Sequence, residues 1–147
     1  MSILVDFHDK FRVVPLKVLE NTNWVLSVRP QQLTLGSMVL SVKQERRGFA
    51  ELSGLEHQEM GALLGQAERL AMQVFQADRI NVLCLMMQDP LLHFHIFPRY
   101  SKTQTFAGIQ WDDSDWPGPP HIAPVATDEC LQIEILNSLT SYDAMYV

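Results

Sequence analysis

The alternation of apolar and polar positions divides the first part of the chain into three strand-like segments. Residues 16–20, 24–30 and 37–43 are rich in β-branched and large apolar side chains, and turn-forming residues separate them, which is typical of strands. The link between the second and third segments contains Gly36 and has the length of a hairpin loop. We therefore expect these two strands to pair antiparallel.

A long helix is expected over residues 55–77. Apolar side chains recur there at helical spacing and form one face of the helix. Ser53 is followed three residues later by Glu56, which is the pattern of a capping box at a helix start. The apolar face is expected to pack against a sheet, and a second helix with similar spacing is expected over about 126–142.

Two further strands are expected after the long helix. The continuous apolar sequence of residues 80–87 is typical of a central strand that is buried on both faces. Residues 91–97 form the next strand, which ends at Pro98, and the short turn between the two predicts an antiparallel hairpin. Residues 101–125 are too rich in proline and glycine for regular structure.

This order of strands, helix and strands predicts an α+β fold around one mostly antiparallel sheet. The chain has 147 residues, a length that fits a single domain over 1–147. We expect the core of this domain in about 16–100, followed by a loop and a helix in 101–147.

The composition limits the possible partners and the cellular setting. The formal net charge of −6 argues against a broad basic surface for a nucleic-acid polymer, whereas a few local donors suffice for a small anion. The N-terminal segment lacks the apolar core of a signal peptide, and no apolar stretch is long enough to span a membrane. Cys84 is expected to be a buried thiol, and with Cys130 it forms no pattern of disulfides or zinc ligands. We therefore expect a reducing, cytoplasmic setting.

Two histidines lie close together in the sequence LLHFHIFPRY. Because alternate residues of a strand share a face, the imidazoles of His93 and His95 project together. Three interpretations are open: two half-exposed structural histidines, two ligands of a first-row metal ion, or a nucleophile with its assistant, since a neutral imidazole attacks phosphorus. The residues available as further metal ligands are His8, His57, Asp89 and His121.

The sequence HFHIFPRY resembles the end of the histidine triad motif, in which three histidines alternate with apolar residues and Pro-Arg follows two apolar residues later. LGSMVLSVK resembles the Pro-Gly-His-Val-Leu-Val segment of this family, and FAELSGLEHQEMGALL resembles its Leu-x-x-Leu sequence and Glu-rich helix start. Met87-Gln88-Asp89 is similar to a Met-Gln-Asp sequence of the fragile histidine triad branch. The resemblance extends from about Trp24 to Tyr100.

The resemblance implies an α+β fold with a mostly antiparallel sheet of five or six strands, one long helix and a C-terminal helix. It also implies a homodimer that binds small nucleotides, with no nucleic-acid polymer and no membrane as partner. The implied activity is that of a nucleotidyl hydrolase or transferase acting on the α-phosphate of dinucleoside polyphosphates or nucleoside phosphoramidates, through a covalent nucleotidyl-histidine. The attack requires no cofactor, and the substrate can arrive as a magnesium complex.

Counting back from Pro98-Arg99 sets the register of the motif. The third histidine falls on His95, the middle, nucleophilic one on His93, and the first on Leu91, which departs from the family. The family's Gly-Gln-x-Val approach to the motif is also missing. The other register makes His95 the nucleophile and breaks the match to Pro-Arg. A nucleotide-binding module without turnover is the alternative function.

The resemblance also implies residues that contact the substrate. Gln88 aligns with a glutamine that contacts the phosphate, and Arg29 falls near an asparagine close to the ribose. Arg99 is expected either to meet a phosphate or to cap the edge of the sheet. The sequence WDDSDWPGPPH predicts either an ordered surface loop or a lid or dimer arm that brings Trp116 or His121 near the substrate.

Overall fold

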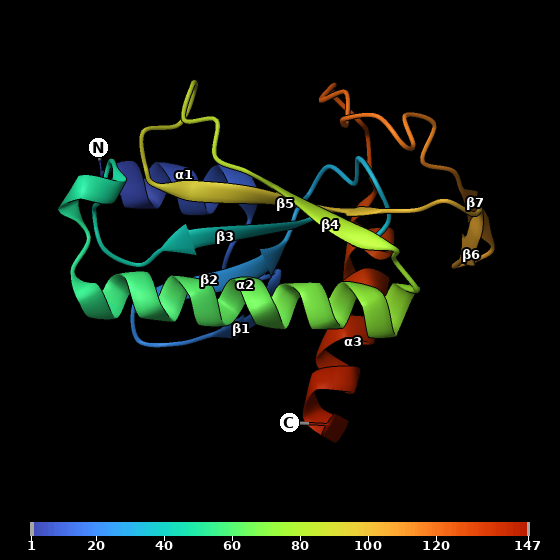
Figure 1. The fold of residues 1–147 in the computed structure, drawn as a ribbon, viewed down its shortest axis with the longest axis horizontal. Coiled ribbons are helices and arrows are strands. Elements are labelled where there is room, and N and C mark those ends of the chain that lie inside the picture. Colours follow the sequence, from blue (N-terminus) through green and yellow to red (C-terminus); the bar gives the residue numbers. More distant parts are fainter. Residues whose placement is uncertain (1, 147) are drawn as a thin grey trace.

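The computed structural model describes residues 2–146 and has a five-stranded antiparallel sheet as its centre (Figure 1). From one edge to the other, the strands are β1 (Lys17–Glu20), β2 (Trp24–Val28), β3 (Met38–Val42), β5 (His93–Arg99) and β4 (Arg79–Leu83). The helices are α1 (Ile3–Phe11), α2 (Gly54–Phe75) and α3 (Glu129–Tyr146), with a short 3-10 helix at Phe49–Glu51. A separate hairpin consists of β6 (Gln104–Phe106) and β7 (Ile109–Trp111). The predicted α+β fold is confirmed.

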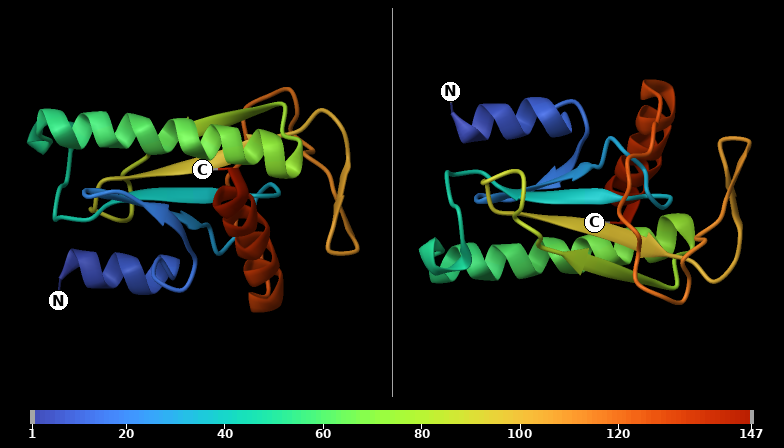
Figure 2. Two further views of the ribbon diagram at one scale, coloured as in Figure 1. Left: turned by 90° about the horizontal axis from the view of Figure 1, so that it is seen from below. Right: turned by 90° about the horizontal axis from the view of Figure 1, so that it is seen from above.

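Helices cover both faces of this sheet (Figure 2). α2 contacts β2, β3, β4 and β5 on one face. α1 lies on the opposite face, and α3 packs at the end of the sheet against α2, β1 and β2. Residues directly opposite each other in an antiparallel pair project from the same face. The pair Leu40 and Phe94 therefore faces α2, and the pair Ser41 and His93 faces α1.

The predicted long helix is confirmed, and its first turn is capped as expected. The Ser53 hydroxyl accepts a hydrogen bond from the Glu56 backbone N–H at 3.1 Å, and the Glu56 carboxylate accepts one from the Ser53 backbone N–H at 3.0 Å. The indole N–H of Trp24 donates to the Glu56 carbonyl at 2.8 Å, which ties this end of α2 to the sheet. The face of α2 that packs on the sheet buries Leu63, Ala67, Leu70, Ala71 and Phe75.

The prediction of a central strand at 80–87 was wrong. β4 is shorter and forms the edge of the sheet, where Val82 is 40% exposed, and β5 lies between β3 and β4. An apolar run does not specify which neighbour will cover it, and this one continues into an exposed loop where Met87 is 86% exposed. Cys84, at the start of that loop, is half-buried rather than buried.

The strand that carries the histidines also continues past its predicted end. β5 includes Pro98 and Arg99. The Arg99 carbonyl accepts from the backbone N–H of Asp78 on the β4 side, so the missing N–H of Pro98 falls on the β3 side. Pairing with β3 ends at Ile96, and the proline therefore interrupts no ladder hydrogen bond.

Neither α1 nor the β6–β7 hairpin was predicted from the sequence. α1 is only nine residues long, and the Ser2 hydroxyl caps it by accepting from the Leu4 backbone N–H at 3.2 Å. The β6–β7 hairpin lies within the segment expected to be irregular, and Ala107 and Gly108 form its turn with φ of 54° and 72°. Within residues 2–146, no helix is both long and apolar enough to cross a membrane.

Candidate functional site

The two histidines of the motif lie side by side on β5 beneath α1. Their ring centroids are 5.0 Å apart and the rings are nearly perpendicular. Phe7 packs against the His93 ring at 4.9 Å, and Phe11 lies 5.9 Å from the His95 ring. The side chains are 2% and 8% exposed, so they are buried rather than half-exposed on a sheet surface. This packing restricts the rotation of both rings.

The hydrogen-bond partners of the rings assign opposite tautomers to the two histidines. Nδ1 of His93 lies 2.6 Å from the carbonyl oxygen of Leu91. Because a carbonyl only accepts, this nitrogen carries the hydrogen, and Nε2 keeps its lone pair. Nδ1 of His95 accepts from Nε of Arg29 at 3.2 Å, so the hydrogen of His95 is on Nε2. The pair therefore offers one nucleophilic nitrogen and one N–H donor.

Both imidazoles are held in the neutral form. Burial lowers the pKa of His93, and the Leu91 carbonyl opposes part of this change. Burial, followed by the positive charge of Arg29, lowers the pKa of His95 from its ordinary value of 6.5 to about 4. A neutral imidazole is the form that attacks an electrophile. Both rings therefore have the protonation state that nucleophilic attack at neutral pH requires.

A cavity of about 330 Å³, the histidine cavity, opens beside the two rings. The end of α1 and the loop after β4 form two of its walls, and residues 122–124 form a third. Lys10 and Asp89 join the first two walls through hydrogen bonds of 3.0 and 2.9 Å. This volume falls within the usual range for small-molecule sites.

Arg29 and Gln88 both line the histidine cavity. Gln88 is an exposed residue of its lining. The Arg29 side chain is buried beside His95, and its guanidinium lies 5.3 Å from the Phe97 ring. It also donates to the Gln31 carbonyl at 2.7 Å. A cationic group is thus fixed next to the histidines.

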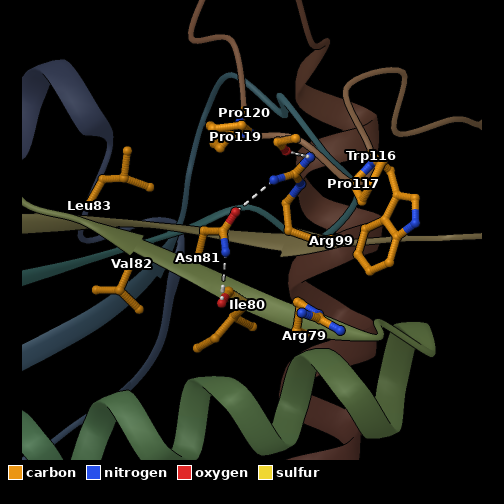
Figure 3. A pocket seen from close by; sticks show the side chains of 11 residues that line it. Arg79, Ile80, Asn81, Val82, Leu83, Arg99, Trp116, Pro117, Pro119 and Pro120 are labelled. Atoms are coloured by element: carbon orange, nitrogen blue, oxygen red, sulfur yellow. Dashed lines mark hydrogen bonds between the residues drawn. The ribbon is translucent and has the colours of Figure 1, made fainter.

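Arg99 lies on the same face of β5 but belongs to a different part of the molecule (Figure 3). Its guanidinium donates to both carboxylate oxygens of Asp113, at 2.6 and 3.1 Å. It also donates to the Asn81 side chain at 2.6 Å and to the Gly118 carbonyl at 2.8 Å. The side chain is 3% exposed. Arg99 therefore anchors the loop that follows β7 and does not line the histidine cavity.

The tryptophan-rich loop and the residues that follow it lie in different places. Trp116 lies near Arg79 and Arg99, at a second cavity, whereas residues 122–124 reach the histidine cavity. His121 is exposed, and its backbone N–H donates to the Asp115 carboxylate at 3.0 Å. No residue of the loop proposed as a lid, WDDSDWPGPPH, lines the histidine cavity, so neither Trp116 nor His121 lies at the histidines.

The cavity also contains residues that the sequence analysis did not identify. Lys10 and Phe11 come from α1, and Leu85 comes from the loop after β4. Phe7 and Phe11, four residues apart, have the spacing of one face of an amphipathic helix. Nothing in that spacing indicates that the helix covers the histidines.

Of the further metal ligands considered from the sequence, Asp89 lines the histidine cavity and His8, His57 and His121 do not. Across residues 2–146, no group of three histidine, cysteine, aspartate or glutamate side chains is arranged to hold a metal ion. Asp89 is paired with Lys10, and His57 and His121 are exposed elsewhere.

No model of a protein family matches the sequence, and no curated protein is similar to it at a significant level. Solved structures nevertheless share its architecture. A histidine triad protein from Sinorhizobium meliloti superposes with a TM-score of 0.69 at 14% identity, over 86% of this chain and 87% of the other. A histidine triad protein from Marinobacter aquaeolei gives 0.63 at 22% identity, over 92% and 95%.

A third similar structure is a diadenosine triphosphate hydrolase from Plasmodium falciparum in complex with cyclomarin A. Its TM-score is 0.68 at 11% identity, over 99% of each chain. Identities this low establish a shared fold alone. With its five-stranded antiparallel sheet, the protein has the fold of the histidine triad proteins.

Proposed function

We propose that the protein is a nucleotidyl hydrolase or transferase that acts on the α-phosphate of dinucleoside polyphosphates or nucleoside phosphoramidates. The observation that carries the proposal is the pair of complementary tautomers in one cavity. His93 presents a lone pair at Nε2, and His95 presents an N–H. The likeness in fold to a diadenosine triphosphate hydrolase supports the same class of substrate.

In the first step, Nε2 of His93 attacks the α-phosphorus. A P–N bond forms, and the bond from phosphorus to the leaving group breaks. A nucleoside polyphosphate leaves as an anion and needs no proton, whereas the nitrogen of a phosphoramidate takes a proton from solvent and leaves as the neutral amine. The Nε2–H of His95 donates a hydrogen bond to a phosphoryl oxygen, and the Leu91 carbonyl stabilises the positive charge of the nucleotidyl-imidazolium through Nδ1–H.

In the second step, water attacks the phosphorus and the P–N bond breaks. The nucleoside monophosphate leaves, a proton passes to solvent, and His93 returns to its neutral form. A different acceptor in place of water gives a transferase.

The departure from the family at Leu91 is compatible with this chemistry. The Leu91 side chain is fully buried in the core, whereas its backbone carbonyl makes the contact to His93. That contact does not depend on which side chain stands at this position. Arg29 adds a fixed positive charge close to where the phosphate would bind, and Gln88 at the rim is a further phosphate contact.

The attack itself uses no cofactor in this proposal, and magnesium arrives with the polyphosphate. Both cysteines are free thiols, which supports a reducing, cytoplasmic setting.

We also propose a homodimer. β4 forms an edge of the sheet, and Val82 and Leu85 are 40% and 46% exposed. An open edge strand with exposed apolar side chains on it and in the loop that follows it favours pairing with a second copy. Val82→Glu should then convert the protein to a monomer in sedimentation experiments, and an unchanged mass would contradict this interface.

A second candidate function is nucleotide binding without turnover. The very low exposure of both rings, together with the Lys10–Asp89 ion pair at the rim, favours it. Mass spectrometry separates the two functions. The wild type and His93→Ala are incubated with diadenosine tetraphosphate and with adenosine 5′-phosphoramidate, and both the released AMP and the intact protein mass are measured.

We expect AMP from the wild type, a transient adenylyl adduct, and a loss of about 10³-fold or more in His93→Ala. His121→Ala is the matched control, because this histidine lies outside the cavity. AMP binding without release, in both proteins, would favour the non-catalytic function.

A further inference from the structure

A second cavity, here called the Trp116 cavity, lies along β4 at the edge of the sheet and has a volume of about 540 Å³ (Figure 3). Its floor is β4 together with Arg99, and its wall is the segment Trp116–Pro120. The mechanism proposed above uses none of these residues.

The Trp116 cavity has a fixed shape because its wall is tied to its floor. Arg99 holds Asp113 and the Gly118 carbonyl, which anchors the loop on both sides of Trp116. The Arg79 guanidinium lies 5.2 Å from the centre of the Trp116 ring. An aromatic wall and an exposed cation are therefore presented together.

One end of the Trp116 cavity lies next to His95 in the sheet. Leu83, which lines it, is paired directly with His95 in the sheet. From there β4 runs to Arg79, which is paired with Arg99. The two pairs are four residues apart along β4, or about 13 Å at about 3.3 Å per residue. Leu83, Asn81 and Arg79 alternate along the strand and so project from the histidine face.

A substrate whose reacting phosphate lies at His93 reaches the Trp116 cavity only if its leaving group is long. The outer phosphates and second nucleoside of a dinucleoside polyphosphate span such a distance, whereas the small leaving group of a phosphoramidate does not. The chemistry fits, because a base stacks on an aromatic ring and the guanidinium of Arg79 attracts phosphate.

We propose that the Trp116 cavity binds the leaving nucleotide and makes the protein selective for dinucleoside polyphosphates over substrates with small leaving groups. This inference rests on the proposed function, since it assigns the part of the substrate beyond the bond that breaks.

The test compares two substrates that share the adenylyl group, diadenosine tetraphosphate and adenosine 5′-phosphoramidate. In Trp116→Ala and Arg79→Gln, kcat/KM for the first should fall about tenfold, and kcat/KM for the second should stay within about twofold. Trp116→Phe should recover most of the loss, because it retains an aromatic wall. Trp111→Ala, at the other tryptophan of the region and outside the cavity, is the matched control.

A binding measurement keeps the inference testable without turnover. In His93→Ala, calorimetry should show tighter binding of diadenosine tetraphosphate than of AMP, and Trp116→Ala added to this protein should remove the difference. Equal affinities for the two ligands, or an equal loss of activity with both substrates, would overturn the inference and leave the proposed function standing. Absence of turnover with the affinity difference intact would overturn catalysis alone, and absence of binding to either ligand would overturn both.

Discussion

The two faces of the central sheet are similarly buried, but one is apolar and the other mixes apolar and polar side chains. Toward α2, the sheet presents Leu26, Leu40 and Phe94, which exclude water and need no partners. Toward α1, it presents His93 and His95, and the hydroxyl of the neighbouring Ser41 is buried without a hydrogen-bond partner in the described structure.

Burying polar groups costs free energy unless they are fully hydrogen-bonded. The difference between the faces therefore indicates that they have different roles. The α2 face stabilises the fold, and the α1 face retains polar groups that stability alone would not favour. Four predictions test this comparison, from the largest expected effect to the smallest.

The largest effect is expected on the α2 face. Leu40 is fully buried between Leu26 and Phe94. Leu40→Ala should lower the free energy of unfolding by about 2–5 kcal/mol through lost contacts and a cavity. Denaturant unfolding measures this, with Val5→Ala on the exposed side of α1 as control. A change below about 1 kcal/mol would show that this face is not the stabilising one.

The α1 face should make stability depend on pH. The pKa of His95 is lowered from 6.5 to about 4 in the folded protein, so the unfolded chain binds more protons in this interval. The stability that the folded protein owes to neutral His95 is complete above pH 6.5 and is lost as the pH falls toward 4. The loss from this residue amounts to about 3 kcal/mol, and the lowered pKa of His93 acts in the same direction.

Unfolding curves measured across this pH interval give the loss of stability, and NMR titration of the ring protons gives the pKa of His95. His95→Gln should flatten the dependence, whereas His121→Gln, at an exposed position, should leave it unchanged. A His95 ring that titrates near its ordinary value would contradict the prediction.

Arg29 should matter more for activity than for stability. In Arg29→Met, His95 loses the donor that fixes its tautomer and the charge that helps to lower its pKa. We expect kcat/KM to fall about 100-fold, and the acid limb of the pH profile to move to higher pH as the His95 pKa rises. Steady-state kinetics against pH measures both. Lower activity with an unmoved acid limb would leave Arg29 as a substrate contact only.

The smallest effect is expected at the rim of the histidine cavity. The Lys10–Asp89 ion pair is partly exposed, and Lys10→Ala should change the free energy of unfolding by less than about 1 kcal/mol. Lys17→Ala, which removes the comparable exposed pair with Glu20, is the control. A loss well above that of the control would mean that the pair holds α1 onto the histidines.

Local patterns predicted much of the fold. The helical period and the capping residues Ser53 and Glu56 located α2, and Gly36 marked the β2–β3 hairpin. The shared face of His93 and His95 followed from the two-residue period of a strand. These features depend on neighbours within a few positions, so the sequence carries them directly.

The site itself was only partly predictable. Its two histidines were named from the sequence, and the resemblance placed Arg29 close to the ribose of a substrate rather than against His95. The helix above them was missed, since α1 is short and its two phenylalanines give no indication of what they cover. β4 was assigned to the centre of the sheet because its composition resembles that of a buried strand.

By itself, the sequence determined most of the central strands, the long helix and the shared face of the two histidines. The tertiary structure decided which groups meet. Arg29 reaches His95 across 66 residues, while Arg99, only four positions beyond His95, turns to Asp113 instead. Strand order and helix docking set these contacts, and both follow from the packing of the whole chain rather than from any local period.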